Sequence, residues 1–155
     1  MSIVGQIEKK TQARVVKLFR EQLGYDYLGD WTEREDNRNI EEDLLRTFLR
    51  EKQGCDEALI MRALHLLDKA AGDTSKSLYD RNRAVYDLLR YGVKVKAEVG
   101  ENTQTVWIVD WKRPERNHFA IAVEVTIPGC DAKAHTKRPD VVLYVNGIAL
   151  GVLEL

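Results

Sequence analysis

Residues 138–155 read RPDVVLYVNGIALGVLEL and contain the strongest structural signal in the sequence. Asn146 and Gly147 form a dipeptide that favours a tight hairpin between two apolar runs. Because VVLYV and IALGVLEL are continuously apolar, they predict central strands that are covered on both faces. Two carboxylates, Asp140 and Glu154, bracket this hairpin, and its register decides whether they share one face of the sheet.

The hairpin can pair in two ways. A regular two-residue loop sets Asp140 opposite Leu153, so that Glu154 points to the other face. A three-residue loop, or a single bulge, brings Asp140 and Glu154 to the same face as diagonal neighbours, about 7–8 Å apart. We expect an odd loop or a bulge, because two such acids and a backbone carbonyl make an open site for Mg²⁺. The alternative is that both acids are simply solvated at strand ends.

A divalent cation held by these acids has a specific chemical use. Mg²⁺ prefers oxygen ligands and keeps several of its waters, so a phosphate group can complete its coordination. Such a metal activates water and stabilises the negative charge that develops on a phosphodiester during hydrolysis.

Composition indicates an ordinary globular protein, with 44% hydrophobic and 32% charged residues and a formal net charge of −1. Any DNA-binding face must therefore be local. Cys55 and Cys130 lack CxxC spacing, which predicts reduced thiols in a cytoplasmic protein and no zinc site. The N-terminus lacks the apolar segment of a secretory signal, and the last apolar run is too short to cross a membrane.

Upstream of the hairpin, the hydrophobic period changes at Gly92. Before it, apolar spacing predicts helices at 6–24, 43–54, 56–72 and 76–92, with Asn39 as a helix N-cap and a polar loop at 25–38. After it, strands are predicted at 93–99, 105–111, 118–127, 141–145 and 148–155. We expect one α/β domain (α+β-like) over 1–155, helical over 1–92 and mainly strands over 93–155.

Basic and aromatic residues supply further candidates, each with two interpretations. Lys133, Lys137 and Arg138 precede Asp140, where they contact DNA phosphates or form a solvated loop. A second basic loop holds Lys112, Arg113 and Arg116, and is more simply a turn between strands. The tryptophans either stack on nucleic-acid bases or pack in the core, which is their commoner role; they are Trp31, Trp107 and Trp111.

A family resemblance enters with the same hairpin. Pro139-Asp140, thirteen intervening residues and then Glu154-Leu155 resemble the PD-(D/E)xK nuclease motif, broken off before its lysine. The hairpin as a whole is similar to the stretch that carries this motif in the R (restriction or motor) subunits of type I restriction-modification enzymes. Further blocks resemble the N-terminal region of these subunits, namely TQARVVKLFREQLGYDYLGDW, NIEEDLLRTFL, RNRAVYDLLRYGV and NHFAIAVEVTI.

The resemblance implies a Mg²⁺-dependent DNA endonuclease domain with a restriction-endonuclease-like core, a mixed sheet flanked by helices and truncated in its last strand. Asp140 and Glu154 would hold the metal, and the carbonyl of Leu155 would add a ligand. The family's lysine belongs immediately after Leu155, so we expect the chain to be a fragment with little or no activity of its own.

The resemblance also draws attention to the first helix and to a neighbouring strand. Many nucleases of this fold carry a glutamate on that helix, at the position that matches Gln12. Gln12 either faces the site through water or lies on the surface, and we favour the surface. Glu8 is a weaker candidate, one turn away. Glu124 supports the metal face from the next strand or occupies a simple edge position.

The implied partners are DNA and the modification and specificity subunits of a type I complex. ATP would be used only by a motor region outside these residues, which contain no GxxxxGK[ST] phosphate loop. Two rival interpretations remain. One is a nuclease of the same fold from a repair or defence system, and the other is a catalytically dead module that docks DNA or a protein.

Overall fold

The computed structural model describes residues 3–96, 98–127 and 136–155, with side chains from Gly5 onward. Contacts within the chain define two compact units, which we describe separately. The first unit combines Met1–Glu41 with His118–Leu155, and the second comprises Glu42–Asn117. The expectation of one domain over 1–155 stays a prediction.

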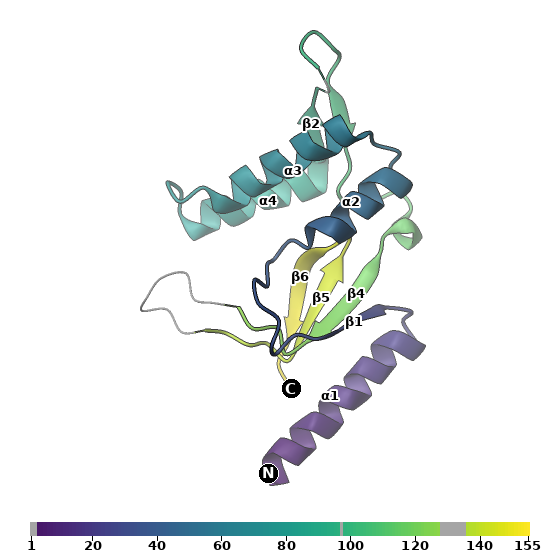
Figure 1. Cartoon of the computed structure of the whole chain (residues 1–155), viewed down its shortest axis with the longest axis vertical. Coiled ribbons are helices and arrows are strands. Elements are labelled where there is room, and N and C mark those ends of the chain that lie inside the picture. The colour runs from purple at the N-terminus through teal and green to yellow at the C-terminus, as the bar shows by residue number, and fades with distance from the viewer. Residues whose placement is uncertain (1–2, 97, 128–135) are drawn as a thin grey trace. The chain divides into compact units, whose positions relative to one another are not determined.

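The first unit is a four-stranded sheet with one long helix (Figure 1). Its elements are α1 (Ile3–Glu21), β1 (Asp26–Asp30), β4 (Phe119–Val123), β5 (Val141–Val145) and β6 (Ile148–Leu153). The strand order is β1-β4-β5-β6; β1 runs parallel to β4, and the other neighbours are antiparallel. The predicted α/β fold with a mixed sheet is thereby confirmed.

One strand corrects the sequence analysis. Residues 25–38 were expected to be a loop, but Asp26–Asp30 form β1 and pair with β4 from Asp26↔Ala120 to Asp30↔Val123. The segment DYLGD has two aspartates and a glycine, which are uncommon in strands, so its local preference is weak. Pairing with β4 selects the extended conformation here.

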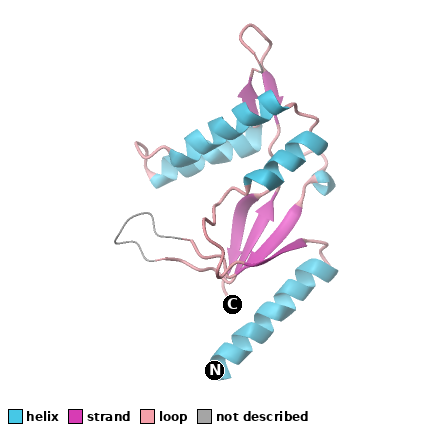
Figure 2. Ribbon diagram, in the orientation of Figure 1, coloured by secondary structure: helices cyan, strands magenta, loops and turns pink. Residues whose placement is uncertain are grey.

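Apolar clusters cover both faces of this sheet. On one face, Ile121, Val123 and Val141 pack against Val15, Val16 and Phe19 of α1, which lies along the sheet in Figure 2. The other face is covered by a second cluster, made of Trp31, Ala120, Ala122, Val125, Val142 and Tyr144. Strands β4 and β5 are therefore buried on both faces, as a continuously apolar sequence predicts.

The hairpin of β5 and β6 contains the predicted bulge. Its loop has two residues, and the positive φ values of Asn146 (51°) and Gly147 (82°) are those of a type I′ turn. The three-residue loop is therefore wrong. The register then shifts between Tyr144↔Ala149 and Leu143↔Gly151, which confirms the bulge.

The expectation that both hairpin strands are central holds for β5 but is wrong for β6. In the described residues β6 is the outer strand of the sheet, and its side chains alternate between partly buried and exposed after Ile148. The apolar sequence of β6 therefore reflects one packed face and an outer edge that is only partly covered. Near the start of β6, Ile40 forms an isolated antiparallel bridge with Ile148.

We predict that the turn residue Asn146 is a large stability determinant. Its side-chain Oδ1 accepts a 2.7 Å hydrogen bond from the backbone N–H of His118, and the residue is fully buried. Asn146→Ala should lower the free energy of unfolding by about 3 kcal/mol, because it leaves that N–H unsatisfied and strains the left-handed backbone. Urea denaturation monitored by circular dichroism measures this change.

Asn146→Gly is the matched control, since glycine tolerates the positive φ but also lacks the acceptor. It should cost about 1–2 kcal/mol, less than alanine. Equal losses in the two variants would contradict a contribution from backbone strain.

The second unit consists of three helices and a small two-stranded sheet. Its elements are α2 (Glu42–Glu51), α3 (Glu57–Gly72), α4 (Leu78–Tyr91), β2 (Val93–Val95), β3 (Gln104–Val106) and the 3₁₀ helix η1 (Pro114–Arg116). Asp56 and Ser77 cap α3 and α4 by accepting hydrogen bonds from the N–H groups of Leu59 and Asp80. The predicted helices are confirmed, and α4 ends before Gly92, as expected.

Some local expectations are wrong, and one of them is the strand predicted at 93–99, since β2 ends at Val95. Asn39 does not cap a helix, because α2 begins at Glu42, and the Asn39 carbonyl instead accepts a hydrogen bond from the N–H of Ala149. The predicted strand at 105–111 ends at Val106, after which Asp110 and Asn117 bond to each other across a loop.

Among the described residues, no helix combines the length and the apolar character that a membrane crossing requires.

Candidate functional site

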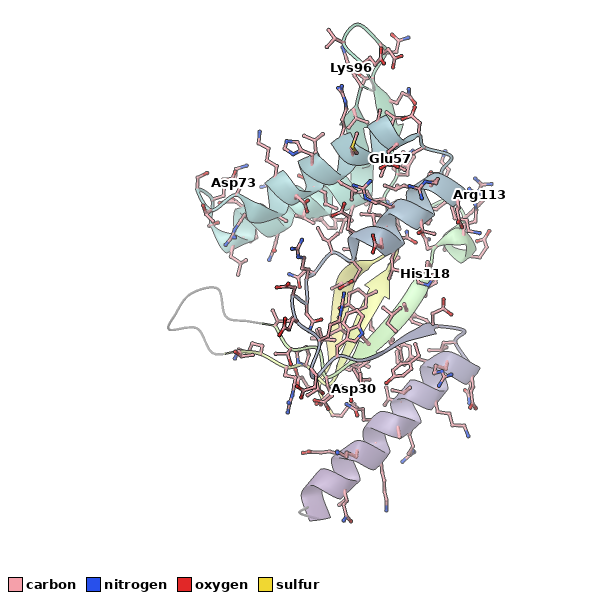
Figure 3. All side chains as sticks on the ribbon, viewed as in Figure 1. Asp30, Glu57, Asp73, Lys96, Arg113 and His118 are labelled. Atoms are coloured by element: carbon pink, nitrogen blue, oxygen red, sulfur yellow. The ribbon has the colours of Figure 1, made fainter. Side chains whose placement is uncertain are left out.

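Four acidic residues lie at one end of the four-stranded sheet, one from each strand. Asp30 ends β1, Glu124 follows β4, Asp140 precedes β5 and Glu154 follows β6. Strand direction explains the grouping, because parallel β1 and β4 end where antiparallel β5 begins and β6 ends. In Figure 3 the labelled Asp30 lies at this end, and Figure 1 shows the chain's C-terminus there.

The bulge determines how the two hairpin acids relate. The recorded register ends at Val141↔Leu153; continued by one step, it would set Asp140 directly opposite Glu154 rather than diagonal to it. The Asp140 carboxylate also accepts a 2.6 Å hydrogen bond from the backbone N–H of Leu155. Asp140 is half-buried, whereas the Glu154 side chain is exposed.

Glu124 is held against Asp140 from the neighbouring strand. Its backbone has a positive φ of 53°, and its N–H donates to the Asp140 carbonyl at 3.1 Å. Its carboxylate has two partners, the Gln12 amide at 2.9 Å and the Arg138 guanidinium at 3.0 Å. The half-buried Glu124 is therefore oriented by three separate contacts, and its support of a metal site stays a prediction.

Gln12 connects the helix to both acidic residues. Its Nε2 donates to a Glu124 carboxylate oxygen at 2.9 Å and to the Asp140 carbonyl at 3.2 Å. The favoured expectation of a surface residue is therefore wrong, because Gln12 is half-buried and bonded to groups more than 110 residues away. Gln12 thus contacts Glu124 directly, without an intervening water.

A cavity of about 260 Å³ lies between this helix face and the acids. From α1 it is lined by Gly5, Glu8, Lys9 and Gln12, whose spacing of three and four residues places them on one face. Its other lining residues are Glu124, Arg138, Asp140 and Leu155. Glu154 is not part of this lining, although its main chain is adjacent.

Asp30 and Lys9 were not predicted as site residues from the sequence. Asp30 accepts hydrogen bonds from the hydroxyl and the backbone N–H of Thr32, and these bonds lower the pKa of its carboxyl group. The Asp-x-Thr spacing is typical of such a turn and could have drawn attention to Asp30. It was not used, because residues 25–38 were assigned to a loop with no site residue. The signal for Lys9 was its place on the helix face of Gln12.

Basic residues before Asp140 have mixed outcomes. Arg138 is at the site through its ion pair with Glu124, and its side chain is 55% exposed. Lys137 pairs through its backbone with Ile127, and its side chain is exposed. Lys133 lies outside the described residues.

The donor chemistry of this site fits a hard divalent cation. Every anionic side chain of the lining is a carboxylate, and the backbone of Leu155 would add a carbonyl oxygen, whereas the Gln12 amide presents its N–H group to Glu124 and Asp140. In the parts of the chain that the structure describes, no three His, Cys, Asp or Glu side chains are grouped closely enough to hold a metal. A cation here would therefore use one or two carboxylates and keep several waters, as Mg²⁺ does.

Comparison with known proteins gives a consistent result. A family model described as "Type I restriction enzyme R protein N terminus (HSDR_N)" matches residues 5–155. A Methanocaldococcus jannaschii protein named "Putative type I restriction enzyme MjaIXP endonuclease subunit" is 30% identical over 76 residues. That match covers 48% of this chain and 7% of the length of the relative.

Proposed function

The chain belongs to the family of type I restriction enzyme R protein N-termini, and from this premise we propose that its acidic site hydrolyses DNA phosphodiester bonds with Mg²⁺. The observation that carries this proposal is the convergence of Asp140, Glu124 and the Leu155 backbone on one cavity, with Glu154 opposite Asp140 when the register is continued by one step. Acids from separate strands lie at this end of the sheet, and the Arg138 guanidinium already compensates the charge of Glu124, so Asp140 and Glu154 are the carboxylates left for a cation.

In the proposed site, Asp140 and Glu154 would hold Mg²⁺, and the carbonyl of Leu155 would be a further ligand. When bound, the metal supplies Lewis-acid stabilisation of phosphate charge and a water of lowered pKa. The Leu155 N–H orients the Asp140 carboxylate through its 2.6 Å hydrogen bond. Gln12 and Glu124 have a supporting role, since Gln12 fixes both Glu124 and the Asp140 backbone.

Cations around the cavity suit an incoming phosphate backbone. Lys9 and Arg138 line it, and Lys137 is exposed next to Arg138. Lysine and arginine side chains bind phosphates without reading sequence, so they would position the strand rather than select it. Lys133, which lies outside the described residues, is proposed to contribute in the same way.

The whole protein is proposed to act as a complex. Its partners would be the modification and specificity subunits, and ATP would be used by a motor region elsewhere in the R protein. We propose a cytoplasmic location, since reduced thiols are usual in that compartment. Cys55 is a free thiol, and burial raises its pKa.

Metal binding to this chain tests the site directly. Titration with Mn²⁺ followed by electron paramagnetic resonance should show a bound ion that Mg²⁺ displaces. Asp140→Asn and Glu154→Gln should each weaken binding at least tenfold, because each removes a charged ligand. Glu124→Gln should have a smaller effect, about two- to threefold, since Gln12 and Arg138 already occupy its oxygens.

Asp68→Asn on α3 is the matched control, an exposed aspartate of the second unit, and should bind Mn²⁺ as the wild type does. A loss with Glu124→Gln but not with Glu154→Gln would reassign the second ligand to Glu124. If the wild type binds no ion that depends on Asp140, the metal site is refuted and the docking-module alternative is favoured.

A further inference from the structure

A second cavity, in the unit of Glu42–Asn117, is unrelated to the acidic site. Its volume is about 440 Å³, and its lining combines two tryptophans with three cations. The lining residues are Gln53, Arg90, Trp107, Val109, Asp110, Trp111, Lys112 and Arg113. Figure 3 labels Arg113, one of the cations on the loop after β3.

Both tryptophans are exposed, and Trp111 is in addition held by a hydrogen bond. Trp111 is 49% exposed, while its indole N–H donates a 2.8 Å hydrogen bond to the Leu89 carbonyl. Trp107 is 38% exposed and adjoins Gly92, where an added Cβ would lie 3.4 Å from its ring. Trp31, by contrast, is 8% exposed and belongs to a core cluster. Only Trp31 therefore has the core role that is commoner for tryptophan.

The single acid of this lining is already neutralised. Asp110 is 8% exposed, and its carboxylate accepts hydrogen bonds from the backbone N–H of Arg113 at 3.0 Å and from the Arg116 guanidinium at 3.1 Å. Arg116 thus has a structural role in the basic loop. Arg90, Lys112 and Arg113 are exposed around the tryptophans. The Arg113 side chain also lies 3.9 Å from the Asp110 carboxylate, and the Arg90 guanidinium lies 5.4 Å from the Trp111 ring centroid.

We propose that this aromatic and cationic cavity binds an unpaired nucleic-acid strand. One base would stack on the exposed face of Trp107 or Trp111, and the phosphates beside it would contact Lys112, Arg90 and Arg113. Aromatic stacking combined with basic groups is the usual chemistry of single-strand binding without sequence preference. A paired duplex does not present its base faces, so it would use only the cations.

The inference does not depend on the acidic site. No residue of the cavity lies in the unit that carries Asp140, so loss of metal binding leaves this prediction intact. A strand bound here would be a contact additional to any strand that is cut.

Fluorescence anisotropy with a labelled oligothymidine of about 15 nucleotides tests the proposal. Binding should be saturable, quench tryptophan fluorescence and weaken with added salt. Trp107→Ala and Lys112→Ala should each raise the dissociation constant about tenfold. The matched controls are Tyr79→Ala, an aromatic residue that is 72% exposed, and Lys69→Ala, an exposed lysine of α3.

Several results would overturn the proposal. One is equal weakening by the control variants, and another is a duplex that binds as tightly as the single strand and without quenching. Tight binding of thymidine monophosphate with no gain from the strand would assign the cavity to free nucleotides instead. Trp107→Phe provides a further check, because it should retain most of the affinity if ring stacking is the cause.

Discussion

An Asp140→Asn variant of the complete R protein should cleave supercoiled plasmid at least about 100-fold more slowly than the wild type, with Mg²⁺ and ATP present. Asparagine keeps the shape of the side chain and an oxygen that can accept the Leu155 N–H, so only the charge is removed. Loss of a metal-holding carboxylate costs several kcal/mol of transition-state stabilisation, which corresponds to this factor. Gel electrophoresis of nicked and linear products measures the rate.

The assay uses the complex with the modification and specificity subunits that we propose as partners. Asp68→Asn should retain a rate within about twofold of the wild type, because surface substitutions away from a site change little. Full cleavage by both the Asp140→Asn and Glu154→Gln complexes would show that the hydrolytic centre lies elsewhere. Unchanged ATP hydrolysis in Asp140→Asn would show that any loss of cleavage is specific to the nuclease step.

Gly92→Ala should destabilise the second unit by about 3–5 kcal/mol. Gly92 links α4 to β2 with φ 76° and ψ 163°, a region that only glycine adopts readily. An added Cβ would lie 2.5 Å from the Thr105 Cγ2 and 3.2 Å from the Val106 carbonyl oxygen. Backbone strain and overpacking, each costing about 1–3 kcal/mol, therefore act together.

Hydrogen exchange measured by mass spectrometry can localise this effect. Peptides from Glu42–Asn117 should lose protection in Gly92→Ala more than peptides from the sheet of the first unit. Gly72→Ala is the control, since Gly72 ends α3 with open space around its Cα, and it should be neutral or stabilising by up to about 1 kcal/mol. Equal stability of the two variants would contradict the role assigned to Gly92.

Local signals were sufficient where neighbouring residues decide the conformation. Asp56 and Ser77 are helix caps whose partners lie three residues away, so α3 and α4 could be predicted from the sequence. Asn146-Gly147 likewise produced a tight turn, because these two residues tolerate the positive φ that it requires. The bulge itself has a signal in Gly151, a glycine inside an apolar strand, which lies opposite Leu143 after the register shift.

The acidic site was only partly predictable. Asp140 and Glu154 were identified from the hairpin that they flank, and the expected bulge is confirmed by the register shift between Leu143 and Tyr144. Glu124 and Gln12 had no decisive local signal. Their 2.9 Å contact joins residues 112 positions apart, and only the packing of α1 beside β4 and β5 creates it.

By itself, the sequence determined the helices, the hairpin turn and the candidate acids, because each depends on backbone preferences and side chains within a few residues. Tertiary structure alone decided that the polar segment Asp26–Asp30 becomes a strand, that Gln12 is drawn in from the surface, and that two of three tryptophans stay exposed. These outcomes depend on hydrogen bonds and burial between distant segments, whose free energy outweighs weak local preferences.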